Sequence, residues 1–203
     1  MRESACDVQG QIAQLMIYPV KSCAGVAVTE AVLLGTGLQW DRHWMVVDAD
    51  GLFVSQRECA RMALVRPHLE PGALLLQAPG MPVLRVPLAA MGAALRVQVW
   101  DDVVQALDMG DEVARWLQSF LEEPALRLVR FDPAAQRLCG TRWTGGVAAS
   151  TQFADGYPVL VTTDSAMDEL NTRLAVQGLP AVGMARFRPN VVLSGLQAHD
   201  EDH

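Results

Sequence analysis

The chain has 203 residues, 51% hydrophobic and 19% charged, which is enough for one large domain or two small ones with a hydrophobic core. Its net charge of −7 argues against a nucleic-acid or anionic-membrane partner, because either would need a basic face. The N-terminus lacks a signal-peptide core, and no apolar run approaches the roughly 18 residues of a membrane span, so we expect a cytoplasmic protein.

Short strands dominate the first half of the chain. Apolar and β-branched runs occur at residues 11–20, 26–34, 44–55, 62–79, 83–88 and 94–107. Asp50–Gly51 and Pro71–Gly72 are turn signals that predict hairpins within two of these runs. Turn signals recur about every 8 to 12 residues, a spacing typical of a sandwich or barrel. We therefore predict a mostly β region.

The first predicted helix lies within residues 108–124. Its apolar side chains recur with helical spacing and form one stripe, made of Val113, Trp116, Leu117, Phe120 and Leu121. Acidic residues open the segment, which suits the helix dipole, and Pro124 stops it.

The second predicted helix lies within residues 162–178. Thr163 is the expected N-cap, and Gly178 is the expected residue after the C-cap. Its buried stripe is expected to consist of Met167, Leu170 and Leu174.

The stretch at residues 139–158 is polar, Gly-rich and poor in strand signals. By its length it is either a mobile connection or a functional loop. The chain then closes with one more strand inside residues 186–203 and a short polar tail, so we expect a domain that is begun here and not finished.

The spacing of cysteine and histidine predicts no metal site. Four cysteines and four histidines are scattered, with no C-x-x-C pair and no histidine at zinc spacing. Neither a disulfide framework nor a structural zinc site is expected, and Cys23 is interpreted as a small core residue.

Polar residues gather where three predicted strands end or begin. These places are Lys21–Ser22, Arg42, and Arg188 with Asn190. Pro189 is expected to hold Arg188 in an extended conformation. Fixed Lys, Arg, Ser and Asn groups suit a phosphate ester, since a guanidinium binds it bidentately and a lysine acts as a point charge.

Each place also has an ordinary structural explanation. Lys21–Ser22 fits a solvated turn, because most lysines and serines are exposed. Arg42 can make a cation–π contact with the tryptophans on either side of it. Arg186 and Arg188 can pair with surface carboxylates, which is worth only about 0–1 kcal/mol. From the residues alone, an anion pocket and these explanations both stay open.

Four segments taken in order resemble the MOSC family with its N-terminal β-barrel domain. They are IYPVKSCAGV, WDRHWMVVDADG, FADGYPVLVTTDSAMDELN and RFRPNVVLSG, and the resemblance runs over about residues 12–197. This is the molybdenum-cofactor group that includes the mitochondrial amidoxime-reducing component and its bacterial relatives. It implies an α+β, mostly β fold, with an N-terminal MOSC-type β-barrel domain, the first part of a MOSC β-barrel, and two helices.

The resemblance also implies a domain order. Residues 1–10 are expected to be an N-terminal tail, residues 11–132 the MOSC N-terminal β domain, and residues 133–203 a partial MOSC domain. The first strands of the β domain are expected to be shared with the MOSC barrel, so the boundary is approximate. A barrel lacking strands would leave unpaired edges.

The cofactor that the resemblance implies is molybdenum-molybdopterin. Its implied contacts are Lys21, Ser22, Arg42, Gly156, Tyr157, Arg188 and Asn190. At Gly156–Tyr157 the backbone or the tyrosine hydroxyl would replace a Thr-Ser pair that lines the cofactor in mitochondrial members.

No metal ligand and no catalytic residue is assigned from the resemblance. The family's molybdenum ligand is a cysteine thiolate in a stretch after the one that RFRPN matches, and none of the four cysteines here occupies that position. Thiolate ligation fixes the metal and its oxidation states. We therefore expect a chain truncated before the ligand, and leave open whether residue 203 is a natural terminus.

The activity that the resemblance implies is that of the front part of a molybdenum-dependent oxidoreductase reducing N-hydroxylated small molecules. Its partners would be that substrate and an electron-donor reductase or iron–sulfur protein. One alternative is a non-catalytic molybdopterin-binding or carrier module. The other is pyridoxal-phosphate-linked sulfur transfer, with Lys21 forming the imine.

Overall fold

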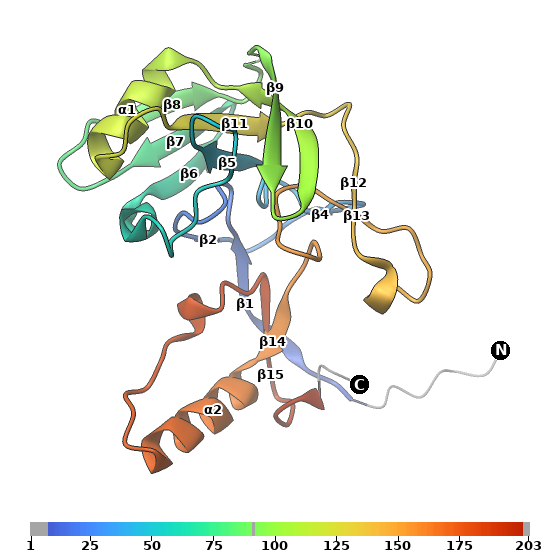
Figure 1. Cartoon of the computed structure of the whole chain (residues 1–203). Coiled ribbons are helices and arrows are strands. Elements are labelled where there is room, and N and C mark those ends of the chain that lie inside the picture. Colours follow the sequence, from blue (N-terminus) through green and yellow to red (C-terminus); the bar gives the residue numbers. More distant parts are fainter. Residues whose placement is uncertain (1–7, 91, 201–203) are drawn as a thin grey trace. The chain divides into compact units, whose positions relative to one another are not determined.

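The computed structural model describes residues 8–90 and 92–200 (Figure 1). Most of the expected N-terminal tail, residues 1–7, and the last residues of the polar tail, 201–203, lie outside the described residues. The described chain consists of many short strands and two α-helices. It is an α+β, mostly β fold, which confirms the predicted fold class.

The elements follow one another closely along the chain. The strands are β1 (Gln11–Ile17), β2 (Val26–Ala27), β3 (Leu33–Leu34), β4 (Gly37–Leu38), β5 (Trp44–Val47), β6 (Arg66–Glu70), β7 (Ala73–Gln77), β8 (Leu84–Pro87), β9 (Ala94–Val99), β10 (Asp102–Asp108), β11 (Arg127–Phe131), β12 (Arg137–Leu138), β13 (Ser150–Thr151), β14 (Val161–Thr163) and β15 (Val191–Ser194). The helices are α1 (Asp111–Leu121) and α2 (Asp164–Val176), with 3-10 turns η1 (Ala60–Leu64), η2 (Thr141–Trp143) and η3 (Met184–Arg186).

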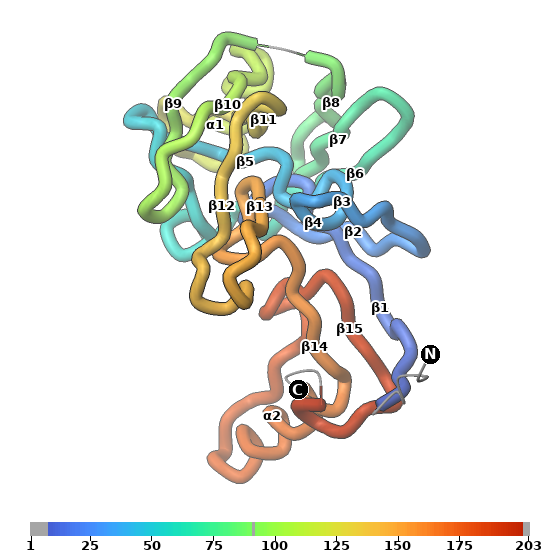
Figure 2. Tube along the Cα trace, turned by 90° about the vertical axis from the view of Figure 1, so that its right-hand side faces the viewer, coloured from blue at the N-terminus to red at the C-terminus, as the bar shows by residue number. Residues whose placement is uncertain are grey.

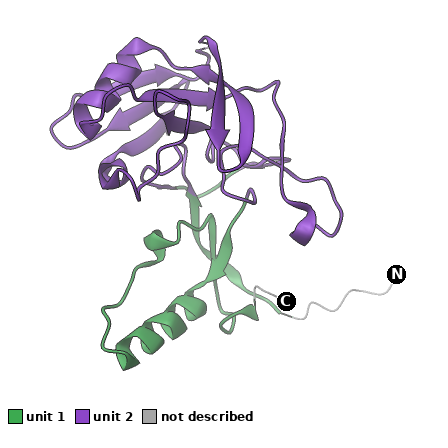
Figure 3. Ribbon diagram, in the orientation of Figure 1, with its two compact units in different colours: residues 1–16, 27–31, 159–203 green, residues 17–26, 32–158 purple. Residues whose placement is uncertain are grey.

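Two compact units make up the chain (Figure 3). Unit 1 consists of residues 1–16, 27–31 and 159–203, and unit 2 of residues 17–26 and 32–158. The units interleave in the sequence, because the chain leaves unit 1 within β1 and returns to it twice. The linear domain boundaries given above stay a prediction.

Unit 2 contains a four-stranded antiparallel sheet in the order β5–β11–β10–β9, which can be followed in Figure 2. A three-stranded antiparallel sheet, β6–β7–β8, belongs to the same unit. Pro71–Gly72 joins β6 to β7, with Gly72 at a φ of +79°, where glycine is favoured. At Asp50–Gly51 the chain turns back after β5, and Val47 pairs with Phe53. Both predicted turns are confirmed.

Strands β5 and β11 of the four-stranded sheet are buried on both faces, whereas β9 and β10 expose alternate residues. Because alternate strand residues point to opposite sides, Trp44 and Val46 of β5 lie in one core cluster, and Met45 and Val47 lie in the other. Helix α1 belongs to the first cluster, and every residue of its predicted stripe is buried. The second cluster includes Phe153, from the Gly-rich stretch between the helices. The later part of that stretch is thus anchored in the core of unit 2 through Phe153.

Unit 1 contains a sheet in the order β14–β15–β1–β2, with β14 parallel to β15 and β15 antiparallel to β1. Helix α2 begins where predicted, since Oγ1 of Thr163 accepts the N–H of Ala166 at 3.1 Å. It also ends where predicted. Gly178 has a φ of +71°, and its N–H donates to the Ala175 carbonyl.

The apolar stripe of α2 is less buried than predicted. Met167, Leu170 and Leu174 are only half-buried, and none of the helix's residues is buried. Neither core cluster includes a residue from the described part of unit 1. The same helical spacing therefore produces a buried stripe in α1, which packs into a large core, and a half-exposed one in α2, which packs against β14 and β15 without one.

Replacing Phe153 by Ala should destabilise the protein by about 3–5 kcal/mol, because it empties a fully buried position against Phe131. Trp143→Ala is the matched control, since this aromatic residue lies on the same stretch and is 71% exposed. Urea unfolding measures both changes. Equally small losses in the two variants would contradict the core position of Phe153.

Candidate functional site

Two of the three predicted polar places meet in unit 2. Segments 18–21 and 42–44 run side by side and are joined through the backbone. Three backbone N–H groups donate to backbone carbonyls of the opposite segment: Arg42 to Tyr18 (2.8 Å), Trp44 to Pro19 (3.0 Å) and Lys21 to Trp44 (2.8 Å). This pairing fixes Lys21 and Arg42 on neighbouring strand ends.

The ammonium group of Lys21 is enclosed. The side chain is 6% exposed, and Nζ donates to the Phe153 carbonyl at 2.9 Å and to Oδ1 of Asp155 at 2.5 Å. The ring centroids of Phe53 and Trp100 lie 5.2 and 5.8 Å from Nζ, within cation–π range. The explanation of Lys21 as part of a solvated turn is therefore wrong.

The charges around Lys21 act on one another. Burial lowers the pKa of Lys21, as do the charges of Arg137 and Arg42, while Asp155 opposes this shift. Partial desolvation raises the pKa of Asp155, but the charge and hydrogen bond of Lys21, the indole of Trp100 and the charge of Arg42 together lower it. Lys21, Arg42 and Asp155 thus form one electrostatic cluster.

Arg42 pairs with the carboxylate of Asp41 at 2.5 Å, and its guanidinium lies over Tyr18 with Cζ 4.4 Å from the ring centroid. The suggested contact with its neighbouring tryptophans stays a prediction. Trp40 and Trp44 stack on each other, with centroids 5.8 Å apart. Arg42 has a φ of +48°, in the left-handed region.

Three of the predicted site residues share this unusual backbone conformation. Ser22, Arg42 and Arg188 have φ values of +66°, +48° and +57°. Such residues cost about 1–3 kcal/mol each and cluster at functional sites. The expected extended conformation of Arg188 is thus wrong. Arg188 does avoid the right-handed helical region, as Pro189 demands, but it turns to the left-handed side.

Arg137 and Asp155 belong to the site, although the sequence analysis identified neither. The Arg137 side chain is 5% exposed, pairs with Asp102, and donates to the carbonyls of residues 152, 154 and 155. It thereby fixes the segment whose Phe153 carbonyl and Asp155 carboxylate hold Lys21. No motif marks Arg137, which lies on the two-residue strand β12. A signal does mark Lys21, the partner of Asp155, because Lys21 is the only lysine among 16 basic residues.

Gly156 and Tyr157 follow Asp155 directly, and both are exposed. The hydroxyl of Tyr157 donates to the Gly140 carbonyl at 3.1 Å, which ties the two ends of the stretch together. At Gly156 an added Cβ would meet nothing within 4 Å, so its backbone is approachable.

The third polar place lies in unit 1. Asn190 is 1% exposed, accepts the Leu160 N–H at 3.1 Å and donates to the Met16 carbonyl at 3.2 Å. These contacts give Asn190 a structural role, because they join β1 to the segments that precede β14 and β15. Arg188 is half-buried just after η3. The convergence of Arg188 with Lys21 and Arg42 stays a prediction.

The cysteines of the described chain are core residues. Cys23, Cys59 and Cys139 are buried free thiols, and Cys23 lies in the first core cluster, as interpreted from the sequence. Burial raises the pKa of Cys139, against the charge of Arg137. No group of three His, Cys, Asp or Glu side chains gathers as a metal site within residues 8–90 and 92–200.

His43 supports the segment that holds Lys21. The Gln152 amide oxygen accepts from Nδ1 at 2.6 Å, which assigns the proton to that nitrogen. Nε2 is buried without a partner among the described residues. Burial lowers the pKa of His43 to about 4, with Gln152 opposing and Arg130 adding to the shift.

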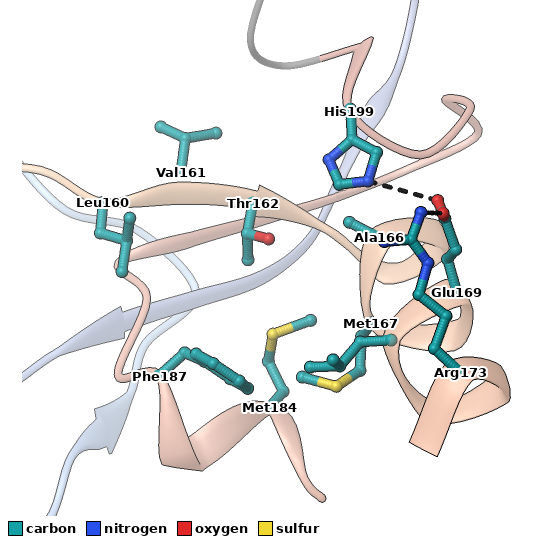
Figure 4. Close-up of a pocket in the computed structure, with 11 residues that line it drawn as sticks. Leu160, Val161, Thr162, Ala166, Met167, Glu169, Arg173, Met184, Phe187 and His199 are labelled. Atoms are coloured by element: carbon teal, nitrogen blue, oxygen red, sulfur yellow. Dashed lines mark hydrogen bonds and ion pairs between the residues drawn. The ribbon is translucent and has the colours of Figure 1, made fainter. Parts of the chain in front are cut away.

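A separate pocket of about 370 Å³ lies in unit 1 between α2, β14 and η3 (Figure 4). Met167, Met184 and Phe187 line it, and a polar edge is formed where Glu169 contacts His199 and Arg173. None of the predicted site residues lines this pocket.

Comparison with known sequences identifies the class of protein. The MOSC N-terminal beta barrel domain matches residues 9–124, so the chain belongs to the MOSC family, as the resemblance implied. It is 36% identical to mitochondrial amidoxime reducing component 2 of Rattus norvegicus, 34% to that of Bos taurus, and 33% to mitochondrial amidoxime-reducing component 1 of Mus musculus. Each alignment covers 95% of this chain. The chain spans 58–59% of the length of these relatives.

Two further comparisons bound the description. A solution structure from Bordetella bronchiseptica covers 52% of this chain and 91% of its own, with 24% identity and a TM-score of 0.41, a likeness too weak to support an inference. In the part of the chain that the structure describes, the helices are too short or too polar to cross a membrane.

His43 should make stability depend on pH. Because its pKa is lowered to about 4, the unfolded chain binds a proton that the folded chain does not as pH falls from about 6.5 to about 4. Stability is therefore lost over that range, by at most about 3 kcal/mol. Urea unfolding at pH 7 and pH 5 should show a smaller loss in His43→Gln than in the wild type. His68→Gln, at an exposed position, is the control, and an unchanged pH dependence in His43→Gln would contradict the assignment.

Proposed function

We propose that this protein binds the phosphate group of a molybdopterin cofactor at the corner of unit 2 formed by Lys21 and Arg42. The observation that carries the proposal is that these two cations, from separate segments, are fixed by backbone pairing within electrostatic reach of each other. Membership of the MOSC family supports it. A chain with a net charge of −7 needs such a local basic cluster to hold an anion.

The donor set fits a phosphate ester. Lys21 supplies a point charge and Arg42 a planar fork of N–H groups, which is the combination that binds phosphate oxygens. Ser22 is half-buried next to Lys21, and the backbone of Gly156 is approachable beside Asp155. Arg188, Asn190 and Tyr157 are proposed as further contacts with the same group.

The molybdenum centre of such a cofactor supplies the electron and oxygen-atom chemistry when it is bound. The residues of this chain would bind and orient the cofactor. The name of the relatives, amidoxime reducing component, supports reduction of N-hydroxylated small molecules as the activity of the whole protein. Its electrons would come from a reductase or an iron–sulfur protein, and its location would be cytoplasmic.

The sulfur-transfer alternative requires Lys21 as a neutral amine. Burial lowers the pKa of Lys21 in that direction and outweighs the ion pair with Asp155, but the sequence around Lys21 has no glycine-rich loop to hold the phosphate of pyridoxal phosphate. We therefore do not propose it.

Lys21→Gln and Arg42→Gln should each lower cofactor content about tenfold in chain purified from cells that make the cofactor, because each removes a charge-assisted hydrogen bond. Elemental analysis of molybdenum and fluorescence of released pterin measure the content. Arg66→Gln is the control, since Arg66 is exposed on β6 in the same unit. Wild-type content in both site variants would contradict the proposed corner.

A titration of the purified chain with the cofactor separates the oxidoreductase from the carrier module. Binding followed by reduction of an amidoxime, with an electron donor supplied, supports the oxidoreductase. Binding without turnover supports the non-catalytic module.

A further inference from the structure

The ammonium of Lys21 has little room for a ligand in the arrangement described. Two of its three N–H groups donate to Phe153 and Asp155, two aromatic rings flank it, and its side chain is 6% exposed. A phosphate oxygen must approach Nζ to about 2.8 Å to form a charge-assisted hydrogen bond. One of the present neighbours must therefore move first.

The neighbours differ in how firmly they are held. Phe153 is 0% exposed and packs on Phe131, so its carbonyl is fixed by the core. The Asp155 side chain, by contrast, is 75% exposed, and Trp100 is 40% exposed. These two are joined to each other, because Nε1 of Trp100 donates to the same carboxylate oxygen that Lys21 contacts, at 2.9 Å.

Trp100 reaches this position through a strained turn. It lies between β9 and β10 with a φ of +54°, a conformation that two-residue hairpin turns normally give to Gly, Asn or Asp. Its carbonyl is held by the Gln98 side chain at 2.9 Å. The strain is the cost of placing an indole against Lys21 and Asp155, and strain of this kind is found at switch segments.

We propose that Asp155 and Trp100 form a latch over Lys21, in which the carboxylate holds the place of a ligand's anionic group and leaves when a phosphate binds. The latch rests on the anion site proposed above, and it determines which anions that site prefers. Arg42 keeps its ion pair with Asp41 when the latch opens. The Asp41 side chain is only 2% exposed, and its Oδ1 also accepts the Tyr18 N–H at 2.7 Å.

The latch selects ligands by charge. A monoanion that displaces Asp155 brings no more charge to Lys21 than the carboxylate it replaces. A phosphate monoester carries about −1.5 to −2 at pH 7, so it gains attraction on exchange. The site therefore favours phosphate esters over carboxylates and chloride.

Asp155→Asn removes the competitor and should tighten binding of inorganic phosphate about three- to fivefold, the range expected for a partly exposed ion pair. Fluorine NMR of 5-fluorotryptophan-labelled protein follows the titration, with the Trp100 signal assigned from Trp100→Phe. Asp101→Asn is the matched control. It changes the same charge next to Trp100 at an exposed turn position, and it should bind phosphate like the wild type.

A second readout uses the composition of the chain. Because Lys21 is the only lysine, an uncharged acylating reagent labels Lys21 and the N-terminal amine alone, and mass spectrometry separates the two. Labelling of Lys21 should be several-fold faster in Asp155→Asn than in the wild type or Asp101→Asn, and phosphate should slow it.

The outcomes distinguish the latch from the site beneath it. If Lys21→Gln abolishes phosphate binding while Asp155→Asn changes neither affinity nor labelling, the latch is wrong and the anion site stands. If phosphate binds to none of these proteins, the anion site is wrong and the latch falls with it.

Discussion

The ion pair between Lys21 and Asp155 is the interaction on which the proposed site depends, and it joins positions 134 residues apart in the sequence. Each partner of the ion pair is fixed by other contacts. Backbone pairing with segment 42–44 fixes Lys21, while Arg137 and the core packing of Phe153 fix the segment that carries Asp155. The buried ammonium loses its hydration, and the Asp155 carboxylate and the Phe153 carbonyl replace part of it.

The fold explains why this corner is rigid. In the central sheet of unit 2, β5 and β11 contribute residues to both core clusters, so these two strands are held by packing on two sides. Lys21 directly follows Val20 and Arg42 lies two residues before Trp44, and both Val20 and Trp44 are buried in that core. In unit 1, by contrast, α2 buries no residue fully. A polar cluster can be held in a fixed geometry only where the surrounding core resists its collapse, and unit 2 provides such a core.

Local patterns in the sequence predicted the elements well and the contacts between distant segments poorly. The α1 stripe, the Thr163 cap and the Pro71–Gly72 turn depend on residues within a few positions of one another, and all three are confirmed. Nothing local marks Arg137 or Asp155, because their roles arise from contacts with far parts of the chain. For the same reason the motif around Lys21 predicted a cation at a strand tip but not its burial.

The most direct test of this account is a titration of Lys21 by NMR in protein labelled with carbon-13 lysine, which gives the signals of one lysine. The account predicts a pKa below the ordinary lysine value, because burial outweighs the attraction of Asp155, and a further decrease in Asp155→Asn. An ordinary lysine pKa that does not change in Asp155→Asn would show that Lys21 is neither buried nor paired. The proposed anion corner would then have no structural basis.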